Sequence, residues 1–225
     1  MILIEQFVAQ ASGAGEDNIS HDLKSPECDV RIVRAISDID SRPVVFVDAP
    51  AFDNSELTEL ETLDLISKCL VKIYKKNMKL AGIVYVHPIS DNRMNGTHMS
   101  SLRMLKTICG DNMSGITIIT SMWNIIKDVD PCAKREAELK SNWWKEYIQR
   151  GCLIERFYAN DPTSARRIIK DMLQGPGLTL QLTKEIVDEK KPLSQTTAGR
   201  SAGGLRSIYK ACVHALGRKT KTISV

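Results

Sequence analysis

Residues 44–53 read Val-Val-Phe-Val-Asp-Ala-Pro-Ala-Phe-Asp, and this stretch decides the fold class. Its first four residues form a continuous apolar run, which is typical of a β-strand that is buried on both faces. Asp48 follows directly, so its carboxylate is expected at the carboxyl edge of a parallel sheet, where open α/β folds bind their ligands. The alternative interpretation is an Asp that starts a turn before a helix, and it carries similar weight when Asp48 is taken alone.

Strand-like and helix-like segments alternate on both sides of this stretch. The strand-like segments are residues 30–35, 44–47, 80–86, 116–119 and 153–158. The helix-like segments are residues 57–74 with a capping box from Thr58 to Glu61, residues 99–109 ending at Gly110, residues 130–151 beginning with Asp130 and Pro131, and residues 161–175 beginning with Asp161 and Pro162. This alternation predicts an α/β domain with a mostly parallel sheet.

No strand-like segment follows Gly175. Helices are expected over residues 180–190 and 205–216, with a linker-like stretch of small and turn-forming residues between them. The sequence therefore divides into a domain over residues 1–175 and a C-terminal helical extension over residues 176–225. Residues 192–225 hold six cationic and no acidic residues, although the whole chain carries only +4. Such a basic tail favours an anionic partner or contact with a membrane surface, and a solvated helix face is an equally good explanation.

Several classes of protein are disfavoured by composition. The six cysteines are scattered and form no C-x-x-C pair, so neither a zinc site nor a disulfide framework is expected. The first residues, Met-Ile-Leu-Ile-Glu, lack the basic region of a signal peptide, and no apolar run approaches the roughly 20 residues that span a bilayer. A cytoplasmic location is therefore expected. No motif for specific nucleic-acid recognition is found.

With its following residues, the opening stretch resembles the D-x-P-G-F-D segment of septin-like and AIG-type immunity-associated GTPases, especially a group of fungal P-loop G-domain proteins. The likeness continues through residues 83–94, Ile-Val-Tyr-Val-His-Pro-Ile-Ser-Asp-Asn-Arg-Met, which are similar to the group's strand and its H-R-I-S-D-N-R-M loop. Residues 120–123, Thr-Ser-Met-Trp, stand where the group has T-T-M-W, its version of the guanine-reading motif. The resemblance covers roughly residues 7–192 and depends on the ordered series of motifs.

The phosphate-binding loop of this class is missing from the sequence. Such a loop needs G-x-x-x-x-G-K-[ST], because its backbone N–H groups and Lys cradle the phosphates. Residues 12–16, Ser-Gly-Ala-Gly-Glu, contain no Lys and follow a helix-like segment. The resemblance implies that residues 7–10 belong to the helix after this loop. It therefore implies a three-layer P-loop GTPase-like domain that lacks its first strand and its P-loop.

The resemblance also implies a function and a set of site residues. The family binds GTP or GDP with Mg²⁺ and hydrolyses GTP slowly, so Asp48 is expected to position Mg²⁺ and the backbone of Ala51 to face the γ-phosphate. Thr120, Ser121, Trp123 and Asn124 are expected to line the base pocket. No residue is identified as catalytic. His87 is expected to be a loop residue at a strand end, and Trp143 and Trp144 are expected to pack a helix.

The hydrogen bonds that a P-loop would supply limit the affinity for GTP that can be expected without it. Each charge-assisted hydrogen bond to an anion contributes about 1.5–3 kcal/mol, and a P-loop supplies several of them, so GTP binding is expected to be impaired. The rival interpretation is a pseudo-GTPase that acts as a protein-interaction module, and a third is a part of a longer GTPase. The missing strand is also expected to expose ladder edges and to favour homodimerisation or aggregation.

Overall fold

The computed structural model describes residues 2–12, 24–25, 28–36, 43–50, 52, 57–91 and 96–202. Its strands are β1 (Lys24–Ser25), β2 (Cys28–Ile36), β3 (Pro43–Asp48), β4 (Ile83–Pro88), β5 (Ile116–Ser121) and β6 (Leu153–Arg156). Its longer helices are α1 (Ile2–Ser12), α2 (Glu59–Lys75), α3 (Gly96–Cys109), α4 (Val129–Glu138) and α6 (Pro162–Gln174). Shorter helical segments are η2 (Trp123–Ile125), η3 (Leu139–Trp143), α5 (Lys145–Gln149), α7 (Gln181–Thr183), η4 (Lys184–Asp188) and η5 (Leu193–Gln195). The predicted α/β class is confirmed.

The strands form two separate three-stranded sheets in the described part of the chain. One is parallel, in the order β4-β5-β6, with Tyr85 paired to Ile118 and Ile118 paired to Ile154. The other is antiparallel, in the order β1-β2-β3, with Val33 paired to Phe46. The prediction of one mostly parallel sheet is therefore wrong for the first half of the chain. A short connection joins β2 to β3, and a short connection produces an antiparallel pair, whereas parallel strands need a long crossover.

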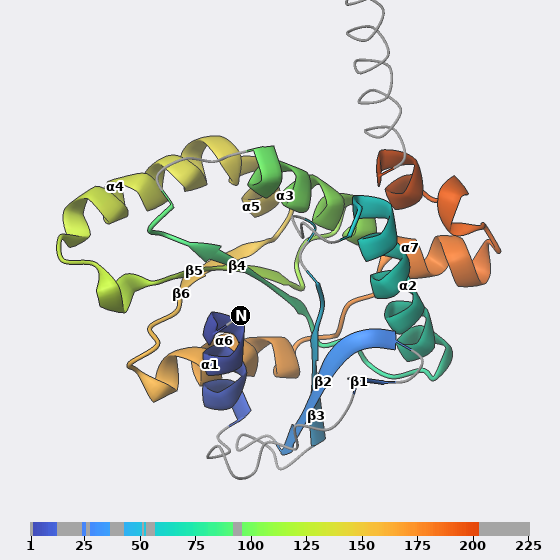
Figure 1. Ribbon diagram of the computed structural model, residues 1–225, viewed down its shortest axis with the longest axis horizontal. Helices are drawn as coiled ribbons and strands as arrows, with labels where there is room; N and C mark the ends of the chain where they lie inside the picture. Colours follow the sequence, from blue (N-terminus) through green and yellow to red (C-terminus); the bar gives the residue numbers. More distant parts are fainter. Residues whose placement is uncertain are drawn as a thin grey trace, which may run out of the picture.

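Helices cover both faces of the parallel sheet, as Figure 1 shows. The α3, α4 and α5 helices lie on one side of β4, β5 and β6, and α1 and α6 lie together on the other. The central strand β5 is buried along its whole length, as its apolar sequence predicts. The α2 helix packs instead beside β2, where Cys69 and Ile73 meet Val30 and Ile32.

The α1 helix joins the two sheets into one body. Its Phe7 is buried and contacts Phe157 edge to face, with 5.2 Å between the ring centroids. The same apolar cluster includes Phe46 from β3 and Val84 from β4. The predicted helix over residues 7–10 is confirmed, and its apolar face stabilises a contact between elements far apart in the sequence.

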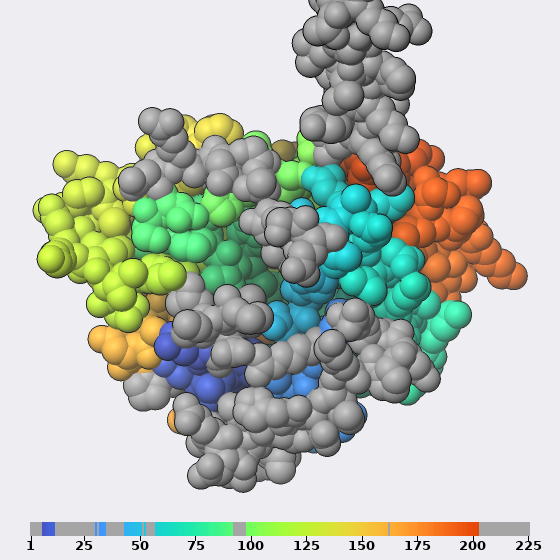
Figure 2. Space-filling model, viewed as in Figure 1, coloured from blue at the N-terminus to red at the C-terminus, as the bar shows by residue number. Residues whose placement is uncertain are grey.

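The last described segment also belongs to the main core. Leu180 and Leu182 are buried together with Leu63 of α2 and Leu105 of α3. Figure 2 shows residues 181–202, coloured orange to red, forming a continuous surface with α2. The predicted helix over residues 180–190 appears as α7 followed by the π-helical turn η4, while the predicted helix over residues 205–216 lies outside the described residues.

Helix ends follow the sequence signals with one exception. The capping box at α2 is present, because the Thr58 hydroxyl accepts from the Glu61 amide and the Glu61 carboxylate accepts from the Thr58 amide. Likewise, Asp161 caps α6 with Pro162 in its first turn. The expected cap at Asp130 is wrong: Asp128 is the N-cap of α4 and accepts from the Asp130 amide. Both aspartates are good caps, and the chain begins the helix at the earlier one.

One burial prediction for β3 is wrong. The run over residues 44–47 was expected to be buried on both faces, yet Val45 is 42% exposed and Val47 is 37% exposed. Residues of this strand alternate between exposed and half-buried, which is the pattern of a sheet with one covered face.

Among the described residues, no helix is both long enough and apolar enough to cross a membrane.

Candidate functional site

The predicted site lies at the carboxyl edge of the parallel sheet. Strands β4, β5 and β6 run in the same direction, and His87, Thr120 and Arg156 are adjacent in register. The turn after β5 therefore opens at the same edge as the ends of β4 and β6. Ligands of open α/β folds bind at such an edge, and the Thr-Ser-Met-Trp segment lies there; its role in reading a base stays a prediction.

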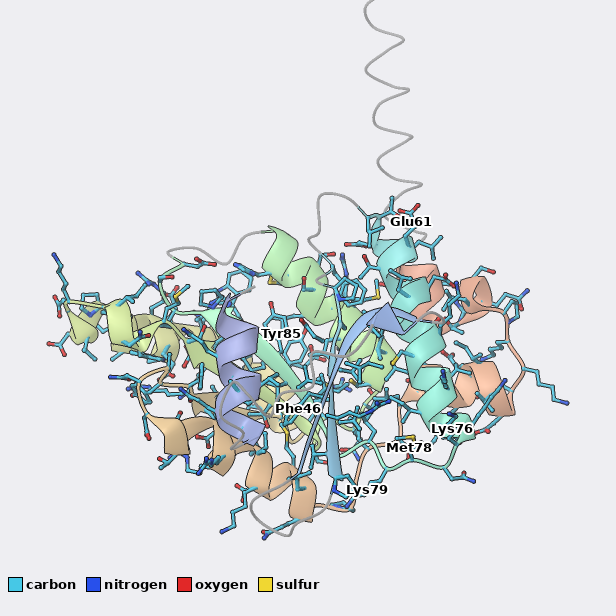
Figure 3. The ribbon with its side chains drawn as sticks, turned by 60° about the horizontal axis from the view of Figure 1, so that its bottom comes forward. Phe46, Glu61, Lys76, Met78, Lys79 and Tyr85 are labelled. Atoms are coloured by element: carbon cyan, nitrogen blue, oxygen red, sulfur yellow. The ribbon has the colours of Figure 1, made fainter. Side chains whose placement is uncertain are left out.

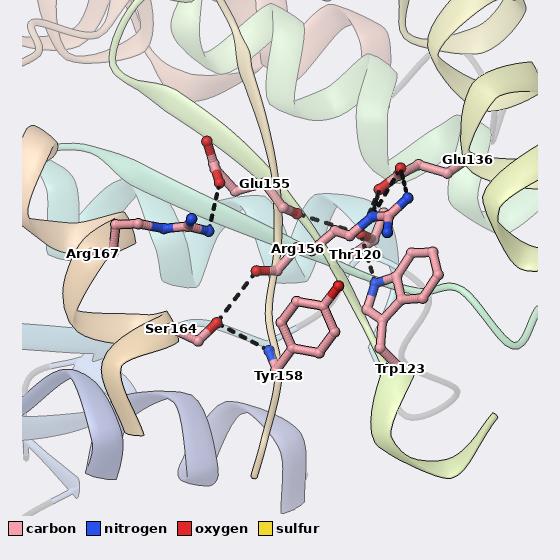
Figure 4. A network of polar contacts seen from close by, with 8 residues as sticks. All are labelled: Thr120, Trp123, Glu136, Glu155, Arg156, Tyr158, Ser164 and Arg167. Carbon is pink, nitrogen blue, oxygen red and sulfur yellow. Dashed lines mark hydrogen bonds and ion pairs between the residues drawn. The ribbon is translucent and has the colours of Figure 1, made fainter. Parts of the chain in front are cut away.

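A buried polar network fills this edge (Figure 4). Trp123 donates from Nε1 to the Thr120 hydroxyl at 3.0 Å, and that hydroxyl donates to Glu136 Oε1 at 3.0 Å. Arg156 donates to both oxygens of this carboxylate: its Nε lies 3.2 Å from Oε1 and 3.1 Å from Oε2, and its Nη2 lies 2.7 Å from Oε2. Lys140, one turn further along the helical segment, lies 3.3 Å from the same carboxylate.

The network keeps Glu136 ionised inside the protein. Burial alone raises the pKa of a carboxyl group, but hydrogen bonds from Arg156 and Thr120 and the charge of Lys140 oppose it, so the pKa of Glu136 is held below its ordinary value. The same hydrogen bonds raise the pKa of Arg156. Side-chain exposure is 5% for Glu136 and 34% for Arg156, so this is a partly buried ion pair with most of its hydrogen-bonding capacity filled.

Arg156 also covers the aromatic ring that the sequence assigned to the base. Its Cζ lies 4.1 Å from the centroid of the Trp123 ring, within the range of a cation–π contact. Tyr158 lies beside Trp123 in Figure 4, with 6.4 Å between the centroids of the two rings. The indole N–H and one ring face of Trp123 are therefore already engaged within the protein.

The remaining predicted residues are distributed unevenly. Ser121 is buried and directs its hydroxyl toward the His87 carbonyl oxygen at 3.4 Å. Asn124 is exposed in η2. Asp48 is half-buried at the end of β3, and the expectation that it ends a strand of a parallel sheet is wrong, because β3 pairs antiparallel with β2 in the described chain. Ala51 lies outside the described residues. Of the four residues predicted to line a base pocket, Asn124 alone presents its side chain freely to solvent.

The backbone of this turn is unusual. Met122 has a φ of 71° and lies in the left-handed region, which costs a residue with a side chain free energy and is often found at functional sites. The conformation turns the chain sharply between β5 and η2. It thereby directs Trp123 into the network and Asn124 outward.

A second cluster at this edge was not predicted from the sequence. His87 lies within β4 and is only 1% exposed, so the expectation of a loop residue is wrong. Its ring contacts those of His98 and Trp144 edge to face, with centroids 5.0 and 5.4 Å apart. Burial is the largest of the causes that lower the pKa of His87 to about 4; His98 and Arg135 act in the same direction, and Asp91 opposes them. Trp144 is fully buried, as its predicted role in helix packing requires, but Trp143 is 40% exposed, so the same prediction is wrong for Trp143.

Sequence reasoning also missed Glu136, which has the highest density of polar contacts at the edge. A signal for it exists, because Cys132, Glu136 and Leu139 recur at helical spacing and are all buried. A carboxylate in an apolar helical stripe requires a partner. That partner, Arg156, is 20 residues away on β6, and spacing along the chain gives no indication of the pairing.

The metal expectation rests on Asp48. Within the described ranges, no three His, Cys, Asp or Glu side chains gather into a group that could hold a metal ion. Mg²⁺ is often held by one or two carboxylates together with substrate phosphates and water, so the role of Asp48 as a single protein ligand to a Mg²⁺–nucleotide complex stays a prediction. A shallow hollow bordered by Thr117, Leu153 and Arg167 lies at the opposite, amino end of β5 and β6.

Comparison with known proteins adds no family assignment. No protein-family model matches this sequence, and no curated protein matches it significantly.

Proposed function

We propose that this chain is a guanine-nucleotide-binding domain of the G-domain type, with its nucleotide at the carboxyl edge formed by β3, β4 and β5. The observation that carries the proposal is the turn after β5, in which a left-handed Met122 separates buried Trp123 from Ser121 and brings exposed Asn124 to this edge. In this proposal Asn124 contacts the base, and Asp48 orients Mg²⁺ bound to the phosphates. Mg²⁺ supplies charge neutralisation at the phosphates when it is bound.

The arrangement of the strands also supports a G-domain origin. Strands β2 and β3 form one half-sheet and β4, β5 and β6 form another. In the G-domain fold a further strand lies between two parts of this kind, so their arrangement in the described residues supports the proposal. The proposal covers binding and not catalysis, because no side chain at the edge is assigned to orient water for attack on a phosphate.

Affinity is expected to be low. Without the charge-assisted hydrogen bonds of a P-loop, each worth about 1.5–3 kcal/mol, binding in the high micromolar range or weaker is expected, since roughly 1.4 kcal/mol changes affinity tenfold. Calorimetric titration with GTP, GDP and ATP, with and without Mg²⁺, tests this. The expected result is a preference for guanine nucleotides that depends on Mg²⁺.

Matched variants locate the binding. Asn124→Ala is expected to weaken GTP binding severalfold, whereas Asn142→Ala, at another exposed asparagine of the same region, leaves it unchanged. Equal affinity for ATP and GTP, or equal loss in both variants, would contradict the proposal.

A second candidate is a pseudo-GTPase that serves as a protein-interaction module. It is favoured by the hydrogen bond between Trp123 and Thr120 and by Arg156 lying over the indole ring, since both occupy groups that would otherwise read a base. Complete absence of nucleotide binding in the same titration, from a protein that melts cooperatively, would favour this candidate.

A further inference from the structure

The turn that follows α2 exposes three lysines within five residues. Residues 75–79 read Lys-Lys-Asn-Met-Lys, and every one of them is exposed. The sequence holds no acidic residue between Asp64 and Asp91, and in the described ranges neither Lys75 nor Lys76 forms an ion pair. We call residues 75–79 the basic turn.

Backbone hydrogen bonds hold the basic turn in one shape. Asn77 lies in the left-handed region, with a φ of 51°. Its amide donates to the Tyr74 carbonyl at 3.0 Å, and the Met78 amide donates to the Ile73 carbonyl at 3.1 Å. These two bonds form the Schellman motif, which commonly ends a helix. Because the turn is already ordered, a partner binds it without the entropic cost of ordering a loop.

Met78 is an apolar side chain at the exposed end of this motif. The residue after the left-handed position frequently packs back on the helix, yet Met78 is 49% exposed. Lys76 and Lys79 flank it in the sequence. The helix macrodipole favours a lysine in the last turn, which accounts for Lys75 but not for an exposed methionine beyond the cap.

A second connection supports the basic turn from the side. Lys79 donates from Nζ to the Gly175 carbonyl at 2.6 Å, and a Cβ at Gly177 would lie 2.9 Å from Lys79 Cγ. The Leu178 amide donates to the Leu80 carbonyl at 2.7 Å. The basic turn and residues 175–178 therefore form one continuous rim, in which Lys79 is fixed by the end of α6.

The rim lies at the opposite end of β4 from the proposed nucleotide site. Figure 3 labels Lys76, Met78 and Lys79 together at one end of α2, with Glu61 at the other end. The chain then enters β4 at Ile83, the amino end of that strand, whereas the nucleotide is proposed at the carboxyl edge. A partner at the basic turn leaves the carboxyl edge open, and the inference does not depend on nucleotide binding.

We propose that the basic turn docks this protein on an anionic lipid surface, with Lys75 and Lys76 at the headgroups and Met78 at the boundary of the acyl chains. Lysine is a compact, strongly hydrated charge, and lysine clusters are attracted to anionic leaflets. An apolar side chain among cationic ones suits the interface between headgroups and acyl chains. A nucleic acid fits less well, since residues 75–79 contain no aromatic ring for base stacking and no arginine.

Sedimentation with sucrose-loaded vesicles tests the proposal. One set of vesicles is phosphatidylcholine with about 30% phosphatidylserine and the other is phosphatidylcholine alone, so the two sets differ in surface charge. The full chain is expected to bind the charged vesicles, with an affinity that falls as the salt concentration rises, and not to bind the neutral ones. Binding to neither set, or equal binding to both, would overturn the proposal.

Two double variants locate the contact. Lys75→Gln with Lys76→Gln is expected to lower the partition coefficient about 25-fold, since each lysine close to an anionic leaflet contributes about fivefold. The matched control, Lys134→Gln with Lys145→Gln, removes the same charge at exposed positions of α4 and α5 and is expected to have little effect. Equal losses in the two variants, or no loss in the first, would assign binding to another cationic part of the chain and would overturn the proposal.

A third variant separates a lipid surface from other polyanions. Met78→Ala is expected to lower vesicle binding severalfold while its dependence on salt stays that of the parent, because apolar surface is removed and charge is not. A single-stranded RNA of about 20 nucleotides serves as the competing anion. Unchanged vesicle binding by Met78→Ala would contradict the place of Met78 in the interface. Displacement of the protein from the vesicles by this RNA at equal charge concentration would assign the turn to a nucleic acid and would overturn the choice of occupant.

Discussion

The guanidinium of Arg156 lies between the indole ring of Trp123 and the carboxylate of Glu136, with Cζ 4.1 Å from the ring centroid and Nη2 2.7 Å from Oε2. A residue at the end of β6 thereby fixes the side chain that follows β5. Any ligand that stacks on Trp123 from this side must displace a paired cation. The edge is therefore preorganised around its own ion pair, and this constrains both functional candidates.

Removing the charge of Glu136 tests how much the network stabilises the fold. Glu136→Gln keeps the shape but weakens the bonds to Arg156 and leaves a partly buried cation, so we expect the free energy of unfolding to fall by about 2 kcal/mol. Glu138→Gln, at an exposed position two residues along, is expected to stay within about 0.5 kcal/mol of the parent. Urea denaturation measures both. Equal midpoints for the two variants would show that the network contributes nothing.

His87 predicts a pH dependence of stability. Its pKa is lowered from 6.5 to about 4 in the folded protein, so the unfolded chain binds the proton first as the pH falls. Stability contributed by neutral His87 is complete above pH 6.5 and declines between pH 6.5 and 4, by about 3 kcal/mol in all, since one pKa unit corresponds to about 1.4 kcal/mol. Denaturation curves at half-unit pH intervals measure this decline.

A phenylalanine at the same position serves as the control. His87→Phe keeps a ring against His98 and Trp144 and cannot be protonated, so its stability is expected to change little from pH 6.5 to 4.5. Glu136 and Glu185 also have lowered pKa values, but a carboxylate with a lowered pKa loses its contribution only below the unfolded value of 4.5. If the free energy of unfolding fell equally with pH in the parent protein and in His87→Phe between pH 6.5 and 4.5, His87 would be excluded as the cause of the decline.

Gly82 directly precedes β4 and Gly175 is the C-cap of α6, and the two glycines differ in the space around them. A Cβ at Gly82 would lie 2.7 Å from the Gly115 carbonyl oxygen, whereas a Cβ at Gly175 meets nothing nearer than 3.4 Å. Because the Gly115 oxygen is a backbone atom that also accepts from the Ile83 amide, it cannot move without disturbing β4. Gly82→Ala is expected to destabilise the fold by about 1–3 kcal/mol, and Gly175→Ala by much less, as thermal melts will show.

Local order was readable from the sequence because it depends on neighbours in the chain. The period of apolar residues in α2 and the capping box at Thr58 fixed that helix, and Asp161 with Pro162 fixed the start of α6. The exposure of Val45 was not readable. An apolar run is the same whether a strand is covered on one face or both, and only the positions of distant elements distinguish the two cases.

The candidate site was harder to predict from the sequence, because it too depends on residues that are distant along the chain. Trp123 was correctly placed after a strand that ends at the carboxyl edge, whereas Thr120 lies within β5, which extends two residues beyond the predicted strand. Their partners, Glu136 and Arg156, are 16 and 36 residues from Thr120 along the chain. The network depends on the crossing of α4 over β5 and β6, and pairwise spacing does not encode that crossing.

Phe7 provides a test of the contact that unites the two sheets. Phe7 is 4% exposed, and its ring centroid lies 5.2 Å from that of Phe157. It belongs to the apolar cluster that also contains Phe46 of β3 and Val84 of β4. Phe7→Ala is expected to cost about 3–5 kcal/mol, the range for truncating a buried aromatic ring. It is also expected to raise the rate of amide hydrogen exchange in β3 and β4 together, because residues of both strands pack in the cluster that contains this ring.

The control is Gln6→Ala on the exposed side of the same helix. It removes a polar side chain from solvent and is expected to leave both stability and exchange nearly unchanged, which separates the loss of packing from the change in helix propensity that alanine brings at either position. If α1 were only a peripheral helix, Phe7→Ala would increase exchange in α1 alone and leave β3 and β4 protected. Simultaneous opening of the two strands is the result that requires α1 to hold the antiparallel sheet against the parallel one.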